Sequence, residues 1–95
     1  MSNSDTALIK IMRINNELGI HARAAAKIVA LAGQFKSDLF LRKGDREVDG
    51  DSILAILTLA CPKGTEVEAR IMGEDSEDFM EKLNQLLEQR FEESR

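Results

Sequence analysis

The chain has 95 residues, of which 43% are hydrophobic and 32% charged, with a formal net charge of −4; these proportions are typical of a soluble globular protein with one core, so we expect residues 1–95 to form a single domain. The acidic balance and the lack of a basic cluster argue against nucleic acid as a partner, because phosphate neutralisation requires several Lys or Arg side chains on one face. No apolar run approaches the roughly 20 residues that span a bilayer, and the first ten residues hold no hydrophobic signal segment, so we expect a cytoplasmic protein without membrane insertion.

The first half of the chain is predicted to form strand, helix and hairpin. Residues 6–14 are apolar and rich in Ile, which predicts a strand, but apolar residues at both parities leave its inner face undecided. Residues 22–32 carry Ala, Ile and Val at helical spacing and precede Gly33, which predicts a helix. Residues 37–43 and 47–49 flank a glycine-containing turn and predict a hairpin, with Leu39 and Leu41 toward the core.

The second half is predicted to form helix, strand and helix. Residues 52–59 predict a short helix with Ser52 as its N-cap. Strict alternation over residues 66–71 predicts a strand with one wet face. Residues 76–91 predict a last helix with acidic residues in its first turn. Its apolar stripe comprises Phe79, Met80, Leu83, Leu86 and Leu87. The order β-α-β-β-α-β-α predicts an α/β (α+β) fold, an open-faced two-layer sandwich of a four-stranded antiparallel sheet with three helices on one face.

Cys61 is the only cysteine, so the chain can form no internal disulfide and no cysteine-based metal site. We expect a structural thiol, since a reactive cysteine needs an electropositive setting. With one histidine and one cysteine, we expect no metal site.

His21, the only histidine, stands where the first helix is predicted to begin. The backbone N–H groups of a first helical turn, here including those of Ala22 and Ala24, have no partner within the helix and form a site for an anion. Arg23 can bind phosphate oxygens at the same place through its guanidinium group. The positive potential favours a neutral imidazole, whose unprotonated nitrogen is a nucleophile able to accept a phosphoryl group. The alternative is structural: His21 as a capping residue and Arg23 as a solvated charge.

Several spaced motifs resemble the HPr family, the histidine-containing phosphocarrier proteins of the bacterial sugar phosphotransferase system. They are residues 18–23 (LGIHAR), 25–27 (AAK), 51–53 (DSI), 63–67 (KGTEV) and 73–75 (GED), and the resemblance spans about residues 8–90. It implies that His21 is phosphorylated on Nδ1 by enzyme I, using phosphoenolpyruvate, and that Arg23 binds the phosphate. The phosphoryl group then passes to a IIA component, and the carrier itself holds no cofactor.

One position departs from the family pattern, and another matches a second modification site of the family. The family pattern has Pro where this chain has Ala24, which leaves an extra N–H and a less rigid first turn. Ser52 matches a serine that a dedicated kinase phosphorylates in many family members, and the alternative is plain N-capping.

Apolar side chains near the predicted site are candidates for a transient docking surface. They are Ile20, Ile53, Leu54 and Leu57. The resemblance favours docking, because the family uses the corresponding positions for partners, and the alternative is burial alongside Ile56 and Leu59.

The leading interpretation is a monomeric phosphoryl carrier that works with partner enzymes and is not itself an enzyme. A second interpretation within the family is a regulator controlled by phosphorylation of Ser52. A third, from another class, is an adaptor domain in which His21 and Arg23 bind an anion without covalent chemistry.

Overall fold

The computed structural model describes residues 7–93. In chain order the elements are β1 (Leu8–Arg13), α1 (Ala22–Ala32), β2 (Asp38–Lys43), β3 (Arg46–Asp49), α2 (Ile53–Leu57), β4 (Glu66–Met72) and α3 (Ser76–Glu88), followed by a 3₁₀ turn (Arg90–Glu92). The strands form one sheet in the order β1-β4-β2-β3, with every neighbouring pair antiparallel. No helix within residues 7–93 has the length and apolar content needed to cross a bilayer.

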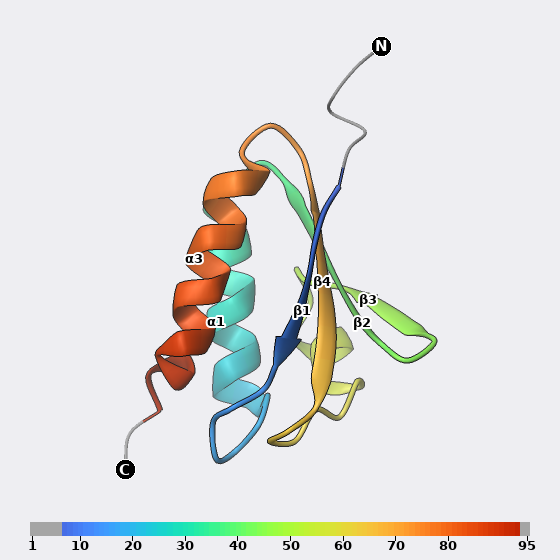
Figure 1. Ribbon diagram of the computed structural model, residues 1–95, viewed down its shortest axis with the longest axis vertical. Coiled ribbons are helices and arrows are strands. Elements are labelled where there is room, and N and C mark those ends of the chain that lie inside the picture. Colours follow the sequence, from blue (N-terminus) through green and yellow to red (C-terminus); the bar gives the residue numbers. More distant parts are fainter. Residues whose placement is uncertain (1–6, 94–95) are drawn as a thin grey trace.

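The two longer helices, α1 and α3, lie side by side against one face of the sheet (Figure 1). The side chains between the two layers are almost fully buried because each helix presents an apolar stripe and each strand presents alternate residues. The sheet contributes Met12, Leu39, Leu41, Val67, Ala69 and Ile71, and the helices contribute Ala24, Ala25, Ile28, Ile56, Phe79 and Leu83. The predicted open-faced sandwich is therefore confirmed, as are the inward positions of Leu39 and Leu41.

The opposite face of the sheet is exposed and is crossed by ion pairs. Arg13 pairs with Glu66 at 2.9 Å, Arg42 with Glu68 at 2.7 Å, and Arg70 with Glu47 at 2.7 Å. The pairing of β1 with β4 places Met12 opposite Val67 on the buried side, so Ile9 and Ile11 fall on the exposed side. This pairing decides the inner face of the first strand.

Four predicted details differ from the structure. The last helix ends at Glu88, short of Phe91, because Arg90, Phe91 and Glu92 adopt left-handed backbone angles with φ of 55° to 58°. The middle helix ends at Leu57, because the Leu59 and Ala60 amides donate to carbonyl oxygens three residues back instead of four. The helical spacing predicts Ala22 on the apolar face of the first helix, but Ala22 is exposed and the core side of α1 begins at Ala24. The first strand spans Leu8–Arg13 instead of the predicted residues 6–14, of which Thr6 lies outside the described residues.

Candidate functional site

His21 caps the N-terminus of α1, as predicted. Its backbone is extended (φ −85°, ψ −177°), and its carbonyl oxygen accepts the Ala25 N–H at 2.9 Å, which opens the helix. The imidazole folds back so that Nδ1 accepts the Arg23 N–H at 3.2 Å. One of the unpaired donors of the first turn is thereby satisfied by the histidine ring itself. Nδ1 therefore faces the backbone amides at the positive end of the helix.

Gly19 sets the direction from which the chain reaches His21. Its φ is +67°, and a Cβ at this position would lie 2.5 Å from the carbonyl oxygen of Cys61 and 2.7 Å from Cα of Pro62. The next residue, Ile20, donates its N–H to the same Cys61 oxygen at 2.9 Å. A larger residue than glycine would push this loop off the segment that follows α2 and displace His21.

Cys61 behaves as the structural thiol that the sequence predicts. Its side chain is buried, and burial raises the pKa of the thiol although nearby Lys43 opposes the shift. The thiol therefore stays protonated at neutral pH and is a poor nucleophile.

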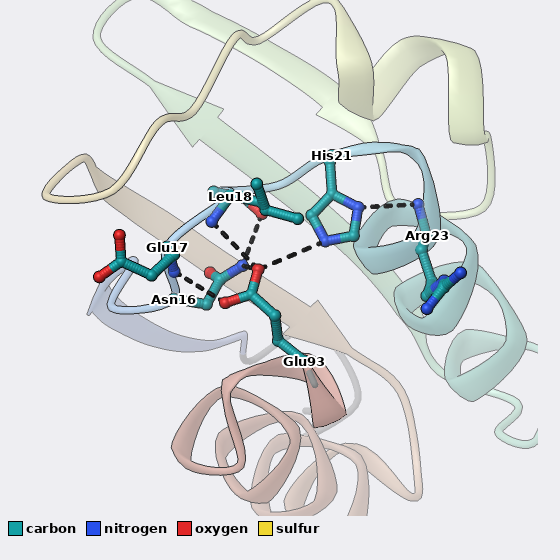
Figure 2. Close-up of polar contacts among 7 residues, drawn as sticks. Asn16, Glu17, Leu18, His21, Arg23 and Glu93 are labelled. Carbon is teal, nitrogen blue, oxygen red and sulfur yellow. Dashed lines mark hydrogen bonds and ion pairs between the residues drawn. The ribbon is translucent and has the colours of Figure 1, made fainter. Parts of the chain in front are cut away.

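Glu93 brings the C-terminal segment against the loop that precedes His21 (Figure 2). One carboxylate oxygen, Oε1, accepts the Glu17 N–H at 2.8 Å. The other, Oε2, accepts the Leu18 N–H at 3.0 Å and the Asn16 side-chain amide at 3.3 Å. Burial opposes ionisation of this carboxyl group, but the hydrogen bonds from residues 16–18, aided by His21, outweigh it and lower the pKa of Glu93 below its ordinary value of 4.5.

The Glu93 carboxylate also faces the histidine ring. Its Oε2 lies 3.8 Å from Nε2 of His21, and the Glu93 side chain is only 7% exposed. Within residues 7–93, Nε2 of His21 is buried and has no hydrogen-bond partner. The two ring nitrogens therefore have different surroundings, a backbone donor at Nδ1 and a carboxylate at Nε2.

A surface pocket adjoins the ring. It is lined by Leu18, His21, Arg23, Phe91 and Glu93. Arg23 is exposed, and among residues 7–93 its guanidinium group has no hydrogen bond or ion pair; it is drawn clear of the imidazole in Figure 2. Arg23 thus gives the pocket a positively charged side chain that is available to bind an anion. Ala24 contributes only backbone here, because its methyl group is fully buried in the core.

Ser52 is the N-cap of α2, as predicted, since its Oγ accepts the Ala55 N–H at 3.1 Å. The side chain is half-buried. This observation confirms the capping role, whereas phosphorylation of Ser52 stays a prediction.

The candidate docking residues divide by exposure. Leu54 is 77% exposed and Ile53 38% exposed, whereas Leu57 is half-buried and packs against the core. The prediction for Ile20 is wrong: its side chain is 6% exposed because the bond from its amide to Cys61 draws the loop inward. Ile56 and Leu59 fill the core beneath them.

Asn16 and Glu93 were not indicated by the sequence. Glu93 follows the predicted end of the last helix and resembles a solvated acidic tail, and its hydrogen-bond partners lie 75 to 77 residues away along the chain. Only the fold brings the two segments together.

Comparisons with known proteins identify the family. The sequence model described as "PTS HPr component phosphorylation site" matches residues 9–89. The phosphocarrier protein HPr of Pseudomonas putida is 46% identical over 81 residues, which are 84% of this chain and 90% of that protein. The chain therefore belongs to the HPr family, the phosphocarrier proteins of the phosphotransferase system.

Solved structures agree with this assignment. HPr from Thermoanaerobacter tengcongensis superposes with a TM-score of 0.87 at 32% identity, over 93% of this chain and 99% of that one. An HPr dimer from the same organism has a TM-score of 0.73 at 34% identity, over 86% and 94% of the two chains. The open-faced sandwich is thus the fold of the family.

Proposed function

We propose that this protein carries a phosphoryl group on Nδ1 of His21, which it accepts from phosphorylated enzyme I and donates to IIA components. The observation that carries the proposal is the position of Nδ1, which lies 3.2 Å from the Arg23 amide at the start of α1. The family assignment supports a phosphocarrier in general, and this geometry favours His21 as the acceptor.

The transfer needs a lone pair and a place for negative charge. The Nδ1 lone pair forms the bond to phosphorus, and the bond from phosphorus to the donor nitrogen breaks with its electron pair remaining on the donor. The Arg23 N–H donates to Nδ1 in the unphosphorylated protein. Once Nδ1 is bonded to phosphorus, this N–H is free to donate to a phosphoryl oxygen. The exposed guanidinium of Arg23 and the amides of Ala22 and Ala24 supply further positive charge. Donation to a IIA component is the same step reversed.

Docking of the partner proteins is assigned to the apolar surface of α2. Ile53 and Leu54 are exposed there, with Leu57 at the edge. Helix α2 packs against α1, whose N-terminus carries His21. Exposed apolar side chains beside a charged site suit a complex that must form and dissociate readily.

Phosphorylation in vitro tests the proposal. The protein is incubated with enzyme I and phosphoenolpyruvate, and the bound phosphate is assayed for the acid lability and base stability of phosphohistidine. We expect one labile phosphate on the wild-type protein and its loss when a IIA component is added. A chain that is never labelled contradicts carriage, whereas labelling without transfer contradicts only the IIA acceptor.

The adaptor alternative predicts a different result in the same material. Titration with inorganic phosphate would then shift the NMR signals of the Ala22, Arg23 and Ala24 amides. Incubation with enzyme I and phosphoenolpyruvate would leave no covalent phosphate. We expect covalent labelling instead.

We further propose that the carrier works as a monomer in the cytoplasm and holds no cofactor. Light scattering at micromolar concentration measures its mass directly. A mass of two chains would contradict the monomer and favour a dimer, the form in which HPr from T. tengcongensis has also been solved.

A further inference from the structure

We propose that Glu93 is a positioning residue for His21: its carboxylate keeps the ring proton on Nε2, and so presents the Nδ1 lone pair to phosphorus. This inference rests on the proposed transfer to Nδ1, but it concerns a residue outside the helix that carries the histidine. It assigns a chemical role to the C-terminal segment of the chain.

The hydrogen bonds of the ring decide where its proton lies. A neutral imidazole carries one N–H, and the nitrogen that accepts a hydrogen bond cannot hold it. Nδ1 accepts the Arg23 N–H, so the proton lies on Nε2. Nε2 is buried and points to Oε2 of Glu93 at 3.8 Å. A relative movement of about 1 Å brings these atoms to hydrogen-bond distance.

The fold holds Glu93 in this place at a conformational cost. The three preceding residues, Arg90, Phe91 and Glu92, are all left-handed although none is glycine, and each such residue is unfavourable because of its Cβ. Such strain persists when the surroundings fix it. Here Phe91 is buried at 2% exposure, and the Glu93 carboxylate accepts three hydrogen bonds from residues 16–18.

The carboxylate matters most after transfer. When Nδ1 uses its lone pair to bond phosphorus while the proton stays on Nε2, the ring becomes a cation. The negative charge of Glu93 stabilises this cation and so keeps the ring protonated, the state in which Nδ1 is a good leaving group. When the phosphorus–nitrogen bond breaks, the electron pair returns to Nδ1 and the ring is neutral again. No proton leaves the ring in either direction.

The experiment compares Glu93→Gln with Glu92→Gln. The control removes the same charge from the adjacent residue, whose side chain is 59% exposed and accepts a bond from Lys27 at 2.8 Å. Ring ¹⁵N NMR of the unphosphorylated proteins, at a pH where the ring is neutral, reports which nitrogen carries the proton. We expect the Nε2–H form to dominate in the wild type and in Glu92→Gln, and its share to be smaller in Glu93→Gln, where only the Arg23 N–H bond to Nδ1 still favours it.

A second readout is the lifetime of the phosphorylated ring. The proteins are phosphorylated with phosphoramidate, a small-molecule donor, and hydrolysis is followed at pH 7. We expect hydrolysis in Glu93→Gln to be slower by up to about tenfold, because less of the phosphorylated ring is protonated without the opposite charge. Glu92→Gln should match the wild type, and Glu93→Asp, which keeps the charge, should recover part of the rate.

Asn16→Ser separates positioning from simple support of the loop. This variant removes the Asn16 bonds to Glu93 and to the Gly19 carbonyl but leaves the carboxylate facing the ring. Equal changes in Asn16→Ser and Glu93→Gln would show a structural role only and overturn the proposal. A wild-type ring protonated on Nδ1 would overturn it even if Glu93→Gln failed to fold. If phosphoramidate labels no histidine, the proposed function fails, and the NMR result still decides the role of Glu93.

Discussion

Nδ1 of His21 accepts the backbone N–H of Arg23 at 3.2 Å, so the atom assigned to phosphoryl transfer is also the cap of α1. Capping and chemistry therefore coincide in one side chain. They are separable, because other residues cap a helix equally well and cannot hold a phosphoryl group on nitrogen.

His21→Asn should keep the fold and lose the phosphate. Asparagine is among the preferred N-cap residues, so we expect the free energy of unfolding to stay within about 0.5 kcal/mol of the wild type. His21→Ala removes the cap as well and should cost about 1 kcal/mol. Urea denaturation measures both, and enzyme I with phosphoenolpyruvate tests labelling. A labile phosphate on His21→Asn would place the acceptor elsewhere.

Arg23→Gln should slow phosphorylation without changing stability. The guanidinium is exposed and has no partner within residues 7–93, so little folding energy depends on it. Loss of one hydrogen-bond donor to the developing charge reduces rates by roughly 10²-fold. The rate of Arg23→Lys should lie between those of the wild type and Arg23→Gln, because lysine keeps the charge but cannot bind phosphate in a fork. The matched control is Arg46→Gln, the same charge change at the exposed start of β3. Equal rates for the two glutamine variants would remove Arg23 from the site.

Ser52 variants distinguish capping from regulation. Ser52→Ala loses the bond to the Ala55 N–H and should lower the free energy of unfolding by about 1 kcal/mol, whereas Ser52→Asp retains a cap and should not. If the site is regulatory, Ser52→Asp should also slow transfer from enzyme I, because it places negative charge beside the proposed docking residues. Chemical denaturation and the labelling rate measure the two effects. Unchanged transfer in Ser52→Asp would leave capping as the role of this serine.

Arg90→Gly should stabilise the protein. The φ of Arg90 is 55°, and a left-handed residue with a Cβ costs about 1–2 kcal/mol. Glycine removes this cost but loses roughly 0.5–1 kcal/mol through the greater freedom of the unfolded chain, so we expect a gain of about 0.5–1 kcal/mol. Arg90→Val, with a branched Cβ, should be destabilising. A glycine variant less stable than the wild type would contradict the left-handed turn.

Stability should decline in acid partly through Asp75. Hydrogen bonds from the Ser37 side chain and from the Lys36 and Ser37 amides lower the pKa of Asp75 below its ordinary value of 3.8. A carboxyl group whose pKa is depressed by folding stabilises the protein above the unfolded pKa, and this contribution is lost as the pH falls through the folded pKa. We expect the urea concentration at the midpoint of unfolding to decrease as the pH drops below about 4. The decrease should be smaller in Asp75→Asn. Parallel curves for the two proteins would exclude Asp75.

Local signals explain which parts of this molecule the sequence predicts well. The caps at His21 and Ser52 depend on residues two or three positions away, so their roles could be inferred from position alone. The inner face of β4 follows from its own alternation of residues.

Non-local contacts explain the rest. The outward positions of Ile9 and Ile11 follow from pairing with β4, which no pattern within β1 specifies. Glu93 reaches the loop before His21 only because residues 90–92 turn left-handed, and the absence of glycine there removes the usual signal for such a turn. Burial of Ile20 likewise depends on a bond to Cys61, 41 positions further along the chain.

The placement of Glu93 has a practical consequence for anyone handling the protein. The start of β1 and the segment that carries Glu93 lie at opposite ends of the molecule (Figure 1). A purification tag or fluorescent fusion joined after Arg95 is tethered beside the carboxylate that faces the imidazole, separated from it only by residues 94 and 95. A fusion on the N-terminal side enters the fold at the start of β1, away from the histidine corner.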